Sequence, residues 1–277
     1  MGFAARLQEA KTHEDAQKGP VSASVATDVI TAALDKAVIE NGLSALYPHG
    51  GPRLAKVLEQ LGQTFNMAAF CQRFRIPPLI AGDLMQVALY DVQLFIDDSG
   101  SMNEADKWDD ARAIVNQIVQ ITTQFDLDGI DVEFMNSPIS GKRLKTSEEV
   151  AALFDQVWRL LEHVVDLRTR RAESCLTLTA VQVRPCGFTP LASTCDRKIL
   201  RPYFERISKL PPNEVKGMII YCITDGAPTT ERGMPTTVTT YKMLEYIDST
   251  LQSMKLPRKT IGFNVTQIGM VPELLLA

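Results

Sequence analysis

Hydrophobic positions follow two different spacings along this chain, and the two spacings alternate. Several short apolar runs have the length and the polar flanks of buried strands. They are residues 92–96, 129–136, 217–224 and 260–268. Between and after them, apolar residues recur every three or four positions, as in helices that pack one face on a core. These helical segments are residues 104–125, 147–157, 191–207 and 238–254. The alternation predicts an α/β fold with a doubly wound (Rossmann-like), mostly parallel sheet flanked by helices.

The segment before the first strand has helical spacing instead. Its apolar positions predict short helices within residues 27–41, 54–61, 65–74 and 79–89. We therefore expect a flexible tail at residues 1–22, a helical extension at 23–90 that packs on the main domain, and an α/β domain at 91–277.

Composition is that of an ordinary globular protein and excludes several classes of partner. The chain has 277 residues, a net charge of −4 and 45% hydrophobic residues. No dense basic patch is present, so we expect no nucleic acid partner. No apolar run reaches membrane-spanning length and no signal peptide is visible, so we expect no membrane and a cytoplasmic location. The five cysteines lack a C-x-x-C pair, which indicates neither a disulfide framework nor a zinc site.

Candidate chemistry begins where the first predicted strand ends, in the run Asp97, Asp98, Ser99, Gly100 and Ser101. This run lies between a strand and a helix, at the edge of the sheet where α/β proteins bind ligands. The order Asp-x-Ser-x-Ser places Asp97, Ser99 and Ser101 at alternate positions of a short loop, so their oxygens can converge. Oxygen ligands without a neighbouring His or Cys in the sequence suit Mg²⁺, Mn²⁺ or Ca²⁺ rather than zinc.

Two later segments add oxygen ligands. Thr189 offers a hydroxyl directly before a helix that we expect to begin at Pro190. Asp225 follows the predicted strand at 217–224 and therefore also lies at a strand end. Asp98 alternates out of the row of ligands, so we expect it to cap the following helix or to support the ligands through hydrogen bonds.

Together these pieces resemble the metal-ion-dependent adhesion site of von Willebrand factor type A domains. The match consists of Asp97, Ser99 and Ser101, then Thr189 in a Gly-x-Thr-Pro-Leu loop, then Asp225 in Ile-Thr-Asp-Gly-x-Pro. The resemblance implies a divalent ion, Mg²⁺ or else Mn²⁺ or Ca²⁺, held directly or through water. It also implies that an Asp or Glu carboxylate of an unidentified protein partner fills the ion's open position.

The resemblance extends over residues 33–269, with two departures. The segment Phe74-Arg75-Ile76-Pro77 and the residues that lead into the Asp-x-Ser-x-Ser run resemble the corresponding segments of fungal cytoplasmic proteins that carry this domain. About two dozen residues at 158–180, including Arg168, Arg170 and Arg171, interrupt the family pattern. They are either a helix extension with an edge strand or an insertion that does not pack, and we expect an insertion. The final helix of the family is expected to be missing.

The predicted function is a metal-dependent protein–protein interaction module and not an enzyme, because no general base or activated nucleophile accompanies the site. The alternative is a metal-dependent hydrolase in which the same ion activates water. The turn Asp98-Ser99-Gly100 also occurs in aspartic proteases, but those need a second such turn in an all-β frame. A haloacid dehalogenase needs an aspartate where Ser99 stands.

Overall fold

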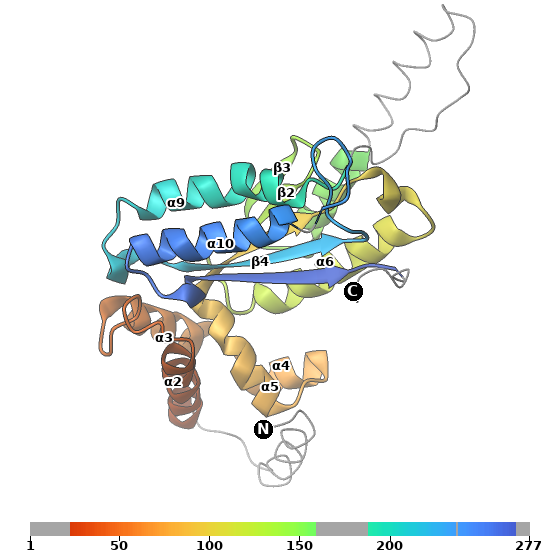
Figure 1. Cartoon of the computed structure of the whole chain (residues 1–277). Coiled ribbons are helices and arrows are strands. Elements are labelled where there is room, and N and C mark those ends of the chain that lie inside the picture. Colours follow the sequence, from red (N-terminus) through yellow and green to blue (C-terminus); the bar gives the residue numbers. More distant parts are fainter. Residues whose placement is uncertain (1–22, 159–187, 237, 270–277) are drawn as a thin grey trace, which may run out of the picture.

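The computed structural model describes residues 23–158, 188–236 and 238–269 (Figure 1). The predicted tail, residues 159–180 of the predicted insertion, and the chain after Gly269 lie outside these described residues. The predictions about those segments therefore stay predictions.

The centre of the fold is a five-stranded sheet with the order β3-β2-β1-β4-β5. Its strands are β1 (Tyr90–Ile96), β2 (Ile130–Phe134), β3 (Ser140–Leu144), β4 (Gly217–Thr224) and β5 (Ile261–Gln267). All neighbouring pairs are parallel except β2 with β3, which is antiparallel. The predicted α/β class with a mostly parallel sheet flanked by helices is confirmed.

The central strand β1 is buried along nearly its whole length, because it lies between β2 and β4 and both of its faces are covered. This explains the continuous apolar run that made it recognisable in the sequence. The edge strand β3 has the sequence Ser-Gly-Lys-Arg-Leu, which carries no such signal, and we did not predict it. A Cβ at Gly141 would lie 2.5 Å from Cδ1 of Leu153 and 2.6 Å from Cδ1 of Leu144, so a larger residue there would have to displace these side chains.

Helices cover both faces of the sheet: α9 and α10 lie on one side and α6 on the other (Figure 1). Their bounds are α6 (Lys107–Thr122), α9 (Arg201–Ile207) and α10 (Val238–Ser253), with α8 (Leu191–Cys195) joined to α9 through one π-helical turn (Asp196–Leu200). A further helix starts at residue 147. Thr146 and Glu149 begin it with a capping box, because each side chain accepts a hydrogen bond from the backbone amide of the other.

The buried side of α10 differs in part from what the spacing of its apolar residues predicts. Recurrence at three and four positions predicts a buried row at Tyr241, Leu244, Ile247, Leu251 and Met254. In the structure Ile247 and Leu251 are buried, but Tyr241 is 67% exposed and Leu244 is 40% exposed. Met243 takes the inward position one turn before Ile247. The first turns of α10 carry apolar residues on several sides, so spacing alone did not determine which side packs on the sheet.

The N-terminal segment forms the predicted helices beside the amino ends of the strands (Figure 1). They are α2 (Ala23–Glu40), α3 (Pro52–Thr64), α4 (Met67–Phe74) and α5 (Pro78–Leu84), followed by a short 3₁₀ turn (Met85–Leu89). The ring of Phe125, after α6, lies 5.0 Å from Phe65 and 5.1 Å from Phe70. Tyr47 donates its hydroxyl hydrogen to the carbonyl of Leu89, at 2.6 Å. The helical extension and the sheet therefore share one apolar core.

Candidate metal site at the ends of strands β1 and β4

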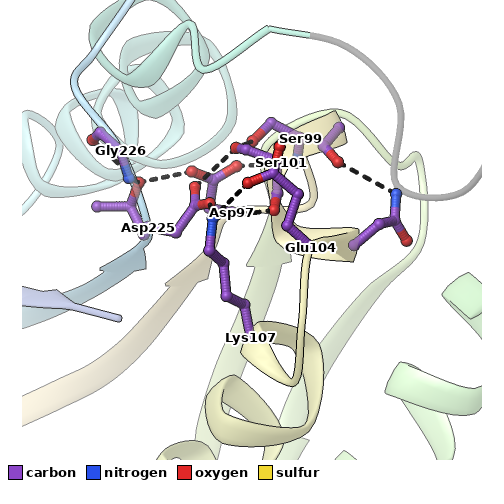
Figure 2. Close-up of polar contacts among 10 residues, drawn as sticks. Asp97, Ser99, Ser101, Glu104, Lys107, Asp225 and Gly226 are labelled. Atoms are coloured by element: carbon purple, nitrogen blue, oxygen red, sulfur yellow. Dashed lines mark hydrogen bonds and ion pairs between the residues drawn. The ribbon is translucent and has the colours of Figure 1, made fainter. Parts of the chain in front are cut away.

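The two strands that carry the candidate aspartates are neighbours and end at the same edge of the sheet. Ile96, the last residue of β1, lies opposite Ile223 of β4. The backbone amide of Asp97 then donates to the carbonyl of Ile223 at 2.8 Å, which continues the pairing one residue further. Asp97 and Asp225 are 128 positions apart in the chain, yet parallel pairing brings them to one place (Figure 2).

Asp97 lies at the base of the site and is fully buried. Its Oδ1 accepts a hydrogen bond from the backbone amide of Ser99 at 2.8 Å, and its Oδ2 accepts one from the hydroxyl of Thr224 at 2.5 Å. Burial raises the pKa of Asp97, while the hydrogen bonds from Thr224 and Ser99 act in the opposite direction. These bonds fix the carboxylate and the loop together. The sequence reasoning missed Thr224, although its place directly before Asp225 was a usable signal.

A row of oxygens runs from Ser99 through Ser101 to Asp225 (Figure 2). The Oγ atoms of Ser99 and Ser101 are 3.2 Å apart, and Ser101 donates its hydroxyl hydrogen to Oδ1 of Asp225 at 2.8 Å. Adjacent ligands of an octahedral ion with bonds of 2.0–2.1 Å are about 2.9 Å apart. The two spacings in the row are close to this value, so these oxygens could serve as neighbouring ligands of a small divalent ion.

A lysine and a glutamate that we did not predict complete the polar group (Figure 2). The Nζ of Lys107 lies 2.8 Å from Oδ2 of Asp225, 3.1 Å from Oε2 of Glu104 and 3.3 Å from the backbone carbonyl of Ser101. The hydrogen bond with Asp225 raises the pKa of Lys107. Lys107 is the first residue of α6, so the helix start determines its position. It lies outside the matched Asp-x-Ser-x-Ser, Thr-Pro and Asp-Gly segments, so the sequence did not indicate it.

Thr189 is buried, and its loop is tied to the loop that follows Asp225. The backbone amide of Thr189 donates to the hydroxyl of Thr229 at 3.0 Å, and its carbonyl accepts from the amide of Thr229 at 2.8 Å. Among the described residues, no hydrogen bond joins the Thr189 side chain to Asp97, Ser99 or Ser101. The structure thus connects four predicted ligands directly and brings the fifth only to the adjoining loop. Pro190 is the residue before α8 rather than its first residue.

Asp98 does not cap the following helix, so that part of the prediction is wrong, while its support of the ligands stays a prediction. Its two oxygens accept hydrogen bonds from the backbone amides of Asn136 and Ser137, at 2.6 and 2.7 Å. The side chain turns toward the end of β2 because alternation along β1 directs it away from Asp97. Burial raises the pKa of Asp98 to about 6, against the effect of these two hydrogen bonds. Asp98 therefore fixes the loop after β2 beside the site.

Another group of carboxylates lies at the opposite, amino ends of the strands. Asp91, Asp126 and Asp128 place oxygens close enough together to suggest a second metal site. Lys216 lies among them, with its Nζ at 3.0, 3.0 and 2.8 Å from their respective oxygens. These charges raise the pKa of Lys216 despite its burial. This one ammonium is paired with all three carboxylates, so none of them is left to a metal and we assign no metal site there.

A cavity of about 420 Å³ borders this ion-pair cluster and does not include the oxygen row. Several of its charged side chains are paired with one another, as in Arg206 with Asp91 and Lys142 with Asp131. It therefore adds nothing to the candidate metal site.

Comparisons of the sequence with protein-family models and with curated proteins give no match. Within the described residues, no helix combines the length and the apolar character needed to cross a membrane.

Proposed function

We propose that the chain is a protein-binding module of the von Willebrand factor type A kind, with a divalent ion at the ends of β1 and β4. The proposal includes a doubly wound arrangement of the sheet and a cytoplasmic location. It rests on the resemblance of the Asp-x-Ser-x-Ser, Thr-Pro and Asp-Gly segments, and on the meeting of the first and last of these at one edge of the sheet.

The observation that carries the proposal is the row formed by Ser99, Ser101 and Asp225, with spacings of 3.2 and 2.8 Å. Serine hydroxyls and carboxylates are ligands that Mg²⁺ and Mn²⁺ bind in proteins. In this assignment Ser99, Ser101 and Thr189 offer hydroxyls, while Asp97 and Asp225 supply negative charge directly or through water. Asp97 is already oriented by Ser99 and Thr224, so the site needs little rearrangement to hold an ion.

A site with few carboxylates suits binding of a further anion. When bound, the ion would offer an open position to an Asp or Glu carboxylate of a partner protein. The chain's own residues set this up, because hydroxyl ligands leave more of the ion's charge uncompensated than carboxylates would. Among the described residues around the row, no histidine or reactive thiol is in hydrogen-bonding contact with it, which favours binding over catalysis.

The test is capture of binding partners from a cell extract in Mg²⁺ and in EDTA, with the variant Ser99→Ala, Ser101→Ala as the matched control. The proposal predicts proteins retained by the wild type in Mg²⁺ and lost both in EDTA and with the variant. Isothermal titration of Mg²⁺ should give binding to the wild type only. Equal Mg²⁺ binding by wild type and double variant would show that the ion binds elsewhere.

A further inference from the structure

We propose that Lys107 determines the charge of the metal site, so that it weakens binding of the divalent ion and strengthens binding of a carboxylate to the loaded site. This inference rests on the proposed function, because it concerns the same row of oxygens. It adds a residue that lies outside the matched family pattern and assigns it two opposite effects.

Lys107 lies directly beside one of the two proposed carboxylate ligands. Its Nζ lies 2.8 Å from Oδ2 of Asp225, and the other oxygen of that carboxylate accepts the hydrogen bond from Ser101. The Asp225 side chain is 1% exposed and that of Lys107 is 22% exposed. The Asp225 end of the pair is shielded from solvent, so salt screens it less than it would screen a fully exposed pair. Lys107 therefore acts on the oxygen row as a fixed positive charge.

Its attachment makes this charge difficult to remove by movement of the side chain alone. Lys107 begins α6, and its ammonium also donates to the backbone carbonyl of Ser101 at 3.3 Å. Ser101 is itself a proposed ligand, so the lysine contacts both a ligand's backbone and a ligand's carboxylate. A residue bound in this way stays beside the row when an ion is present.

Lys107 changes the net formal charge of the site by one unit. Asp97 and Asp225 contribute two negative charges to the site, and Lys107 contributes one positive charge. A divalent ion would leave the group with a net charge of +1 with Lys107 and of zero without it. Glu104 also contacts Lys107, but its side chain is 72% exposed, so water screens its charge and its influence is small.

Opposite effects on cation and anion follow from Coulomb's law. The same positive charge repels the incoming ion and attracts an incoming carboxylate. Removal of the charge should therefore tighten ion binding and weaken carboxylate binding at the loaded site. A role of Lys107 in folding alone would not produce changes of opposite sign.

The experiment compares the wild type with Lys107→Met and Lys107→Arg, using Mn²⁺ as the ion and acetate as the carboxylate. Free Mn²⁺ is measured by electron paramagnetic resonance. Acetate binding is measured as a decrease in the water proton relaxation rate, because acetate displaces water from the bound Mn²⁺. Lys107→Met should bind Mn²⁺ about tenfold more tightly or better, and its Mn²⁺ complex should bind acetate several-fold more weakly. Lys107→Arg, which keeps the charge, should resemble the wild type in both measurements.

Two controls separate this inference from its premise. Glu104→Gln removes the exposed neighbour and should change both affinities by less than about threefold. Lys209→Met removes an exposed lysine at residue 209 and should change neither. If the wild type binds Mn²⁺ and Lys107→Met binds it equally, or if both affinities move in the same direction, the inference about Lys107 is wrong and the metal site stands. If neither wild type nor any Lys107 variant binds Mn²⁺, the proposed function is wrong as well.

Discussion

Thr224, the last residue of β4, donates its hydroxyl hydrogen to Oδ2 of Asp97 at 2.5 Å, across the boundary between β4 and β1. The bond joins two residues 127 positions apart. It holds the innermost carboxylate of the candidate site in one orientation. The two strand ends therefore behave as one unit, and substitutions at Thr224 should affect both stability and metal binding.

Thr224→Val is the first prediction. The substitution keeps the shape of the side chain and leaves Oδ2 of the buried Asp97 without its donor, which should cost about 1–3 kcal/mol of unfolding free energy. Chemical denaturation measures the loss, and Mg²⁺ titration of the same variant should show weaker binding. Thr224→Ser retains the hydroxyl and should lose much less of both. A loss in Thr224→Val no larger than the loss in Thr224→Ser would show that the hydrogen bond to Asp97 contributes little.

The second prediction concerns removal of the metal. Mg²⁺ or Mn²⁺ should raise the thermal midpoint of the wild type, and EDTA should remove the gain, because an ion that binds only the folded state stabilises it by mass action. At about a hundredfold excess over the dissociation constant the gain is ~2.7 kcal/mol. Asp225→Ala should abolish the shift. A normal shift in Ser99→Ala, Ser101→Ala would disprove the assignment of the oxygen row as the site.

The third prediction concerns the ion-pair cluster at the other end of the sheet. Lys216→Met should lower the unfolding free energy by about 3–5 kcal/mol, since it leaves the buried Asp126 without its partner. Lys142→Met provides the control, because Lys142 is 55% exposed in its pairs with Asp131 and Glu133, and it should cost less than about 1 kcal/mol. Urea denaturation of both variants makes the comparison. A small effect at Lys216 would mean that water enters the cluster.

The fourth prediction is a dependence on pH that arises from Asp98. Its folded pKa of about 6 lies above the ordinary value of 3.8, so the folded state binds the proton more tightly than the unfolded state. The stabilisation from this group is complete below pH 3.8 and is lost as the pH rises through 6. Measured in EDTA and relative to Asp98→Asn, the wild-type unfolding free energy should fall by roughly 3 kcal/mol between about pH 4 and 7.

An increase of the relative unfolding free energy with pH would contradict this prediction for Asp98. A relative stability that rises with pH would show that the hydrogen bonds from Asn136 and Ser137 lower the pKa of Asp98 more than burial raises it. In that case the carboxylate form would be the stabilising one throughout the neutral range.

Elements with strong local patterns were predictable from the sequence. The continuous apolar run of β4 gave its bounds at Gly217–Thr224, and β1 was recognised with a difference of two residues at its start. The edge strand β3 was not predictable, because its polar residues pair with β2 through backbone hydrogen bonds that any sequence can make. The buried side of α10 was predicted only in part, since it depends on which residues the sheet offers as neighbours.

Some residues of the candidate site were predictable from the sequence and others were not. Asp97, Ser99 and Ser101 follow from local spacing, and Asp225 follows from the rule that parallel strands end at one edge. Lys107 and Thr224 were missed because their roles depend on partners 118 and 127 positions away. The helix cap expected of Asp98 was wrong because its backbone partners lie at the end of another strand. Contacts of that kind follow from the register of the sheet, which spacing along one segment does not contain.

The cluster around Lys216 also has a consequence for the order of folding. Lys216 contacts Asp126 and Asp128 across sequence separations of 90 and 88 residues, and it immediately precedes the strand that pairs with β1. Ion pairs between such distant residues form only after the intervening chain has closed a large loop. We therefore expect Lys216→Met to accelerate unfolding and to leave the refolding rate nearly unchanged in stopped-flow measurements. That result would mean that the ion pairs of Lys216 form after the folding transition state and that they set the lifetime of the folded protein by slowing its unfolding.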